Sequence, residues 1–347
     1  MPIVAEKDVI RTIRRVKDPD NNKDLISLGR VKELKVQNGE VAFKVLVDPA
    51  RPLSESVLRE LKSLIGEMEG VANVAIRLQE QAGVAGGPIK RPSPQQPIPG
   101  VQHILAVASG KGGVGKSTVA VNLALAIAAE GHRVGLLDAD IYGPSIPTMM
   151  GLKGAQPAAV DKRIQPIPRY GIALMSLGFL VQEDTPMVWR GPMVHSAVTQ
   201  FLREVDWGEL DYLVVDLPPG TGDAHLTLTQ SVPLDGAVIV TTPQEIALID
   251  AKKGLKMFDK VGARVLGIVE NMGSFVCPDC GAEHAIFGAG GGRATAERFN
   301  VPFLGTIPLS VDVTPTGDRG EPIVHAFPDS PIAERFRQIA RRVLAVS

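Results

Sequence analysis

Beyond residue 100, apolar residues occur as short, nearly uninterrupted runs, most of them separated by segments long enough to form a helix. The runs that predict strands are Ile104–Ala108, Val134–Leu137, Ile172–Leu177, Tyr212–Val215, Gly236–Thr241, Val265–Val269 and Phe303–Ile307. Strands of this kind are typical of a mostly parallel sheet that helices cover on both faces. The pattern therefore predicts a doubly wound α/β domain over 100–347, with ligands at the carboxyl ends of its strands.

The first 81 residues show another pattern, in which helical spacing and strand-like alternation take turns. The predicted elements are a helix over Asp8–Val16, strands over Val31–Val36 and Val41–Val47, a helix over 54–67 and a strand over Val74–Leu78. An Asn38-Gly39 pair between the first two strands is typical of a hairpin turn. The order αββαβ predicts a small α+β domain over 1–81.

The segment 82–99 separates the two patterns. It is dense in Gly, Pro, Gln and Ser and has few apolar residues to bury. Such a composition is typical of a semi-extended linker. We therefore expect a small domain, a linker and a larger α/β domain.

Composition narrows the class of protein. The chain has 347 residues, of which 37 are basic and 38 acidic, so no overall field attracts nucleic acid or acidic lipid. No run approaches the roughly 18 apolar residues of a membrane span, and the first residues, MPIVAEKDVI, lack the order of a signal peptide. We expect a cytoplasmic protein with no nucleic-acid partner and no stable membrane association.

A glycine-rich loop, GKGGVGKS, occupies residues 110–117 between the first strand of the α/β domain and a predicted helix over Val119–Ala129. Its glycines let backbone N–H groups turn around an anion, as in a P-loop. Lys116 would place a charge on the β- and γ-phosphates, and the Ser117 hydroxyl would join the Mg²⁺ ligands. The residues expected to contact nucleotide here are Gly110, Lys111, Gly112, Gly113, Val114, Gly115, Lys116, Ser117 and Thr118.

The loop contains a second lysine, Lys111, at a position that an ordinary P-loop leaves unrestricted. The order Lys-Gly-Gly resembles the deviant Walker A subgroup, in which this lysine reaches the nucleotide of a partner subunit. A solvated loop lysine is the alternative.

Carboxylates follow two of the predicted strands. Asp138 and Asp140 end the run RVGLLDAD, and Asp216 ends the strand before the loop DLPPGTGD. Asp140 would orient the attacking water, and Asp138 would support either Mg²⁺ or the fold; capping of the strand is the alternative for both. Asp216 is expected among the Mg²⁺ ligands, and its loop suits a switch that senses the γ-phosphate.

The choice of base rests on Glu270-Asn271-Met272-Gly273, which stands where GTP-specific proteins of this class usually carry Asn-Lys-x-Asp. The carboxylate that reads guanine is absent, which favours ATP. Asn271 would face the base edge or, alternatively, cap a loop.

Cys277 and Cys280 are the only cysteines. In a reducing compartment, a C-x₂-C pair favours metal binding or redox chemistry over a structural disulfide. Two thiolates alone do not complete a tetrahedral metal site or hold an iron–sulfur cluster. An iron–sulfur cluster, a zinc ion and a redox dithiol all remain open from the residues alone.

The C-terminal segment Ile332–Val346 is amphipathic, with arginines outside its apolar face. It would lie on anionic lipid or pack as the last helix of the domain. The residues of the apolar face are Ile332, Phe336, Ile339, Ala340, Val343 and Leu344.

The runs SGKGGVGKST, DADIYGPS, WRGPM, DLPPGTGD and ENMGSFVCPDCG together strongly resemble the Mrp/ApbC iron–sulfur cluster carriers over about residues 100–347. These carriers are related to MinD, ParA and the nitrogenase iron protein. The N-terminal run DPDNNKDLISLGRVKEL resembles the small metal–sulfur cluster assembly domain often fused to them.

The resemblance implies an ATP hydrolase in which Lys111 acts across subunits, Asp140 belongs to switch I and Asp216 holds Mg²⁺. It also implies that Cys277 and Cys280 bind a [4Fe–4S] cluster bridged across a homodimer, with zinc as an alternative occupant. The partners would be a cluster scaffold and apo iron–sulfur acceptor proteins. A MinD- or ParA-like positioning ATPase and an ATP-gated electron-transfer reductase are the rival functions.

The N-terminal domain departs from the pattern of the assembly domain at one position. The assembly-domain pattern carries a cysteine in a Thr-Thr-Pro-x-Cys-Pro loop, and here Arg51 stands at that position. We therefore expect docking or regulation from this domain, not a cysteine-based role.

Overall fold

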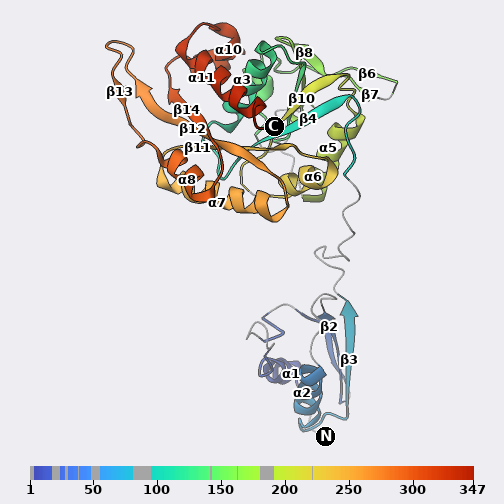
Figure 1. Cartoon of the computed structure of the whole chain (residues 1–347). Helices are drawn as coiled ribbons and strands as arrows, with labels where there is room; N and C mark the ends of the chain where they lie inside the picture. Colours follow the sequence, from blue (N-terminus) through green and yellow to red (C-terminus); the bar gives the residue numbers. More distant parts are fainter. Residues whose placement is uncertain are drawn as a thin grey trace. The chain divides into compact units, whose positions relative to one another are not determined.

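The computed structural model describes residues 4–17, 24–27, 30–37, 39–47, 55–80, 95–140, 143–161, 163–179, 191–220 and 222–347. The chain divides into two compact units, Met1–Arg91 and Pro92–Ser347 (Figure 1). Several positions singled out above lie outside the described residues: Asn38, Arg51, the linker as far as residue 94, Ile141, Tyr142, Trp189, Arg190 and Thr221.

The N-terminal unit has the predicted order αββαβ. Its elements are α1 (Glu6–Ile13), β1 (Val31–Gln37), β2 (Glu40–Val47), α2 (Glu55–Gly66) and β3 (Asn73–Glu80). Strand β2 lies in the middle, antiparallel to β1 and parallel to β3. Alternate residues of β2, namely Val41, Phe43 and Val45, are buried against apolar residues of the two helices, which confirms the expected α+β unit.

The second unit is built on one large sheet in the order β13-β12-β11-β4-β10-β5-β9-β8, with β14 also paired to β12. Every long pairing is parallel; β8 with β9 and β12 with β13 are antiparallel. The strands are β4 (Val101–Ser109), β5 (Val134–Asp138), β8 (Ile167–Arg169), β9 (Ile172–Ser176), β10 (Leu210–Asp216), β11 (Gly236–Thr241), β12 (Val265–Val276), β13 (Glu283–His284) and β14 (Phe303–Leu309), beside a small pair formed by β6 (Ala159–Val160) and β7 (Arg163–Ile164).

Helices cover both faces of this sheet, as predicted. Figure 1 shows α3, α10 and α11 on one face and α5, α6, α7 and α8 on the other. The helices are α3 (Lys116–Ala129), α4 (Ile146–Met149), α5 (Gly191–Glu204), α6 (Asp223–Ser231), α7 (Glu245–Lys260), α8 (Gly291–Phe299), α9 (Val313–Asp318), α10 (Ile323–Ala326) and α11 (Pro331–Leu344), with a 3₁₀ turn η1 at Leu177–Phe179. Helix α3 is apolar on nearly all sides because it is enclosed between the sheet and α11.

Helix α11 uses its apolar face inside the molecule. Phe336, Ile339, Ala340 and Val343 are almost fully buried, and the helix packs on α3 and β14. Of the two roles expected for this amphipathic segment, the structure shows packing as the last helix of the domain. Its apolar face is therefore not free to lie on lipid. Within the described part of the chain, no helix is long and apolar enough to cross a membrane.

Candidate functional site

The candidate nucleotide site forms at the carboxyl ends of three adjacent strands. Strand β10 lies between β4 and β5, so that Asp216 pairs in register with Val107 on one side and with Asp138 on the other. The P-loop starts directly after β4, and Asp140 follows β5. Neighbouring parallel strands therefore bring residues that are far apart in the sequence to one edge of the sheet.

Lys116 is the centre of this group. It is the first residue of α3, its side chain is 6% exposed, and its Nζ lies 2.6 Å from Oδ1 of Asp216 and 3.5 Å from Oδ2 of Asp140. The ammonium also donates to the Ser117 hydroxyl at 3.2 Å. A buried charge needs such partners to offset its desolvation. The carboxylates hold the ammonium at the mouth of the P-loop, where a phosphate would share it.

Two oxygens of the same group are left without partners. Oδ1 of Asp140 and Oδ2 of Asp216 are buried and accept no hydrogen bond. A buried carboxylate oxygen without a donor is costly, and Mg²⁺ prefers oxygen ligands. Burial raises the pKa of Asp216, against the opposing effect of Lys116. The donor set of Asp216 and Ser117, with Asp140 beside it, fits a Mg²⁺ ion.

Asp138 has a different place from the other two carboxylates. Its Oδ1 accepts the backbone N–H of Asp140 at 3.1 Å, and its Oδ2 accepts the Ser176 hydroxyl at 2.9 Å. The Ser176 oxygen in turn accepts the N–H of Gly178 at 2.9 Å. Burial, and then the charge of Asp216, raises the pKa of Asp138 to about 8. Both carboxylate oxygens of Asp138 are engaged in hydrogen bonds that support the loops after β5 and β9. Of the two roles expected for Asp138, these contacts favour support of the fold.

The P-loop fits tightly between α7 and β12. A Cβ at Gly110 would lie 2.1 Å from the carbonyl carbon of Asp250, so only glycine allows the loop to approach α7 this closely. Gly115 has φ +78°, and a Cβ there would lie 2.2 Å from Nδ2 of Asn271. The same Nδ2 donates to the carbonyl oxygen of Val114 at 2.9 Å. Asn271 therefore caps the P-loop in this structure, and reading of the base edge by it stays a prediction.

A cavity of about 460 Å³ opens above the loop, within the usual range of small-ligand sites. Lys111 lines it and is half-buried; among the described residues its ammonium has no hydrogen bond or ion pair. The other loop residues that line it are Gly112, Gly113, Gly115, Lys116, Ser117 and Thr118. Ser145 and Pro219, from the runs DADIYGPS and DLPPGTGD, also line it. Thr148, Met149 and Asp318 line it as well, and no sequence motif pointed to these three.

The loop after Asp216 is anchored to β4. Leu217 N–H donates to the carbonyl of Val107 at 3.0 Å, and Gly220 N–H donates to the carbonyl of Ser109 at 2.8 Å. Next along the chain, α6 carries His225, which sequence reasoning missed. Its ring is buried without a hydrogen-bond partner, and burial, followed by the charge of Lys116, lowers its pKa to about 4. These two hydrogen bonds join the start of the loop after Asp216 to the P-loop strand.

The cysteines lie at the tip of the hairpin formed by β12 and β13. Phe275 pairs with His284 and Val276 with Glu283, and Cys277 N–H donates to the carbonyl of Ala282 at 2.9 Å. Cys277 is half-buried, Cys280 is exposed, and neither forms a disulfide. Hydrogen bonds from the backbone N–H of Cys280, then from that of Asp279, lower the pKa of Cys277. The tip therefore stabilises a thiolate, the form that binds metals.

The cysteines have few described neighbours that could bind a metal with them. Among the described residues, no three His, Cys, Asp or Glu side chains gather as metal ligands. The two thiols thus have no third or fourth protein ligand in their own chain that the structure describes.

Strand β12 joins the two candidate sites. It runs for 12 residues, past Asn271 beside the P-loop and on to Val276, directly before Cys277. Between Asn271 and Phe275 its register with β14 shifts, and Met272 has φ +56°. A bulge in a strand redirects the chain and marks a place of local strain. The strand that caps the P-loop is thus the strand that presents the cysteines.

Comparison with protein families gives two matches. Residues 100–344 match the model of the NUBPL iron-transfer P-loop NTPases, and residues 6–76 match the iron–sulfur cluster assembly protein model. An iron–sulfur cluster carrier protein of Synechocystis is 46% identical over 96% of both chains. The mouse iron–sulfur cluster transfer protein NUBPL is 54% identical over 72% of this chain and 79% of its own length.

Solved structures agree with the fold. A nucleotide-binding protein of Archaeoglobus fulgidus in complex with ADP has a TM-score of 0.59 and 41% identity, covering 67% of this chain and 91% of that one. The cell division ATPase MinD of Pyrococcus furiosus has a TM-score of 0.53 at 23% identity, covering 71% of this chain and 99% of its own. The second likeness shows the shared α/β fold alone.

Proposed function

We propose, on the premise that this chain belongs to the NUBPL iron-transfer P-loop NTPase family, that it is an ATP-hydrolysing carrier of iron–sulfur clusters. Its cargo would be a [4Fe–4S] cluster held between two copies of the chain and passed to apo-proteins. The observation that carries the proposal is the course of β12, which caps the P-loop with Asn271 and ends directly before Cys277. Movement at the nucleotide would reach the thiols through this single strand.

Hydrolysis rests on the residues around Lys116. Lys116 and the P-loop N–H groups would stabilise charge on the phosphates, and Asp140, with its free Oδ1, would orient the attacking water. Mg²⁺ held by Ser117 and Asp216 would neutralise charge on the transferred phosphoryl group. The Glu270 carboxylate accepts the N–H groups of Gly290 and Gly292 at the start of α8. It is therefore not available to read a guanine base, which supports ATP over GTP.

A homodimer completes both sites in this proposal. Four thiolates require two Cys277/Cys280 pairs, and Lys111 is free to reach a partner's nucleotide. The exposed side of α7 next to Gly110 carries Ile246 and Ile249, which are 64% and 46% exposed. Apolar side chains beside a site that needs a second copy are a suitable dimer contact.

The same set of four thiolates fits zinc, which stays the alternative occupant. Both occupants require reduced thiols, so we place the protein in the cytoplasm. A lipid-cycling, MinD-like role gains no support, because α11 packs its apolar face inside the molecule. A scaffold would supply the cluster and an apo iron–sulfur protein would receive it.

The test is anaerobic transfer. The full chain is reconstituted with iron and sulfide and mixed with an apo [4Fe–4S] enzyme, and recovery of the enzyme's activity is followed with and without MgATP. We expect transfer, at a rate that MgATP changes. Retention of the cluster through repeated one-electron reduction, with no transfer, would favour the reductase instead.

A further inference from the structure

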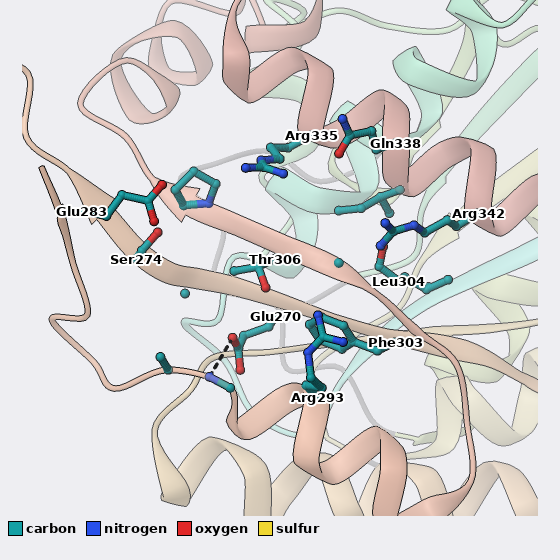
Figure 2. A pocket seen from close by; sticks show the side chains of 16 residues that line it. Glu270, Ser274, Glu283, Arg293, Phe303, Leu304, Thr306, Arg335, Gln338 and Arg342 are labelled. Atoms are coloured by element: carbon teal, nitrogen blue, oxygen red, sulfur yellow. Dashed lines mark hydrogen bonds between the residues drawn. The ribbon is translucent and has the colours of Figure 1, made fainter. Parts of the chain in front are cut away.

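A second cavity, of about 400 Å³, lies away from the nucleotide site, around strand β14. Its lining comes from β14 itself, from the start of α8 on one side and α11 on the other, and from β12 and β13 of the neighbouring hairpin (Figure 2). Within the described sheet, β14 pairs only with β12, so β14 is an edge strand. We call this cavity the basic edge pocket, after its arginines Arg293, Arg335 and Arg342.

These arginines are the unusual feature of the pocket. None of them forms an ion pair with a carboxylate within the described residues. Arg293 lies over the ring of Phe303 at 4.6 Å, and Arg342 donates to the carbonyl of Leu304 at 2.8 Å. Those contacts orient the guanidinium groups but leave most of their five N–H donors available. Planar guanidinium groups held in this way are suited to bidentate binding of carboxylates.

Two carboxylates also line the pocket, and neither forms an ion pair with the arginines within the described residues. Glu270 is buried and accepts the N–H of Gly292 at 2.6 Å and that of Gly290 at 3.3 Å. Glu283 is exposed on the hairpin, on the side away from Arg342 in Figure 2. Positive charge therefore exceeds negative charge in the pocket, and it is concentrated along α11 and at Arg293.

The arrangement of the arginines indicates the shape of the ligand. Arg335 and Arg342 come from α11, which covers one face of the sheet, while Arg293 comes from α8, which covers the other. Successive side chains of an extended polypeptide point in opposite directions. An extended acidic segment beside the sheet edge would thus direct carboxylates to both groups of arginines, which one compact anion would not require.

The pocket and the cysteines share one hairpin. Ser274, just before Cys277 on β12, and Glu283, just after Cys280 on β13, both line the pocket. We propose that the basic edge pocket binds an acidic, extended segment of a partner polypeptide and thereby brings that partner to the Cys277/Cys280 tip. The binding stands independently of the bound metal; its use in delivery rests on the proposed function.

The experiment measures peptide binding to the full-length protein without cluster. The probe is a fluorescein-labelled octapeptide that repeats Glu-Glu-Ser-Ser, so that an extended backbone carries Glu on both of its faces. Its binding is followed by anisotropy, and the control peptide has Gln for Glu. The pocket variant is Arg293→Gln with Arg335→Gln. The matched control is Arg298→Gln with Arg341→Gln, which removes the same charge from the same two helices outside the pocket.

We expect the acidic peptide to bind and the Gln peptide not to bind. Loss of two charged contacts should weaken binding by about tenfold or more in the pocket variant and by less than about twofold in the control. Equal weakening in both variants, or no binding of the acidic peptide, would overturn the proposal. Displacement of the peptide by citrate at equal concentration would also overturn it, since that would make the pocket a small-molecule site. Because the protein carries no cluster in this experiment, the result is separate from that of the transfer assay.

Discussion

The side-chain amide of Asn271 donates a 2.9 Å hydrogen bond to the carbonyl oxygen of Val114, although 157 positions separate the two residues. This bond joins the middle of the P-loop to the strand that carries Cys277. In the proposed function, a change in the loop on nucleotide binding would act on a strand whose register with β14 shifts directly after Asn271. The relationship makes the coupling of nucleotide and cluster testable by single substitutions.

Asn271→Ala should uncouple the two sites. It leaves the Val114 carbonyl buried without its donor, at a cost of about 1–3 kcal/mol, and frees the P-loop from β12. We expect weaker ATP binding and a cluster-release rate that no longer responds to MgATP, with iron content unchanged. Stopped-flow transfer with and without MgATP measures the response. Lys256→Ala, exposed on α7 and outside both sites, is the control and should keep the response. A full MgATP response in Asn271→Ala would contradict the coupling.

Lys116→Ala and Cys280→Ala should have opposite effects. Without Lys116, Asp140 and Asp216 lose their shared cation, and ATP affinity should fall by about a hundredfold or more, since a buried charged pair is broken. Cluster binding should persist. Cys280→Ala should lose the cluster and keep ATP affinity, because Cys280 is exposed at the hairpin tip. Isothermal titration with ATP and iron analysis of both variants test these two expectations. A full cluster in Cys280→Ala would refute the bridged cluster.

Lys111→Ala should separate ATP binding from hydrolysis. Its ammonium forms no hydrogen bond or ion pair with a described residue of its own chain, so folding stability and ATP affinity should change little. If Lys111 stabilises charge on a partner's nucleotide, the hydrolysis rate should fall by about tenfold or more. The exposed Lys256→Ala on α7 serves as the control. An unchanged hydrolysis rate in Lys111→Ala would show that Lys111 is a solvated loop lysine with no part in hydrolysis.

His225 should make the fold sensitive to acid. Its pKa of about 4 lies below the ordinary 6.5, so the unfolded chain binds the proton more readily. The contribution of the neutral His225 ring to the free energy of unfolding is complete above pH 6.5. It is lost as the pH falls toward 4, by up to about 1.4 kcal/mol per pH unit. His225→Leu should flatten the fall of the urea midpoint over this range, and the exposed His284→Leu should not. Parallel curves for His225→Leu and the native chain would exclude this role.

Local patterns were sufficient for much of the fold. The order αββαβ and the strands beyond residue 100 follow from apolar spacing, because each is long enough to show a period. Strands β6, β7, β8 and β13 have two or three residues each, and no period can be read from so few positions. For this reason the hairpin that presents the cysteines was not predicted, although the cysteines themselves were.

The candidate site also has residues that the sequence predicted and residues that it did not. Lys116, Asp140 and Asp216 stand at the ends of predicted strands or at the start of a predicted helix, so strand order alone brings them together. Asn271 was left between two interpretations, since its partner Val114 lies on a distant segment. Met149 and Asp318 reach the cavity through tertiary packing of α4 and α9, and no local pattern marks such contacts.

Metal content of the anaerobically reconstituted dimer tests the central claim most directly. Iron, sulfide and zinc are measured with the absorption spectrum on protein separated by size exclusion, beside Cys280→Ala. We expect about four irons and four sulfides per dimer, and none in the variant, since four thiolates arise only from two chains. Stoichiometric zinc without iron, or a full cluster on a monomer, would contradict the bridged carrier.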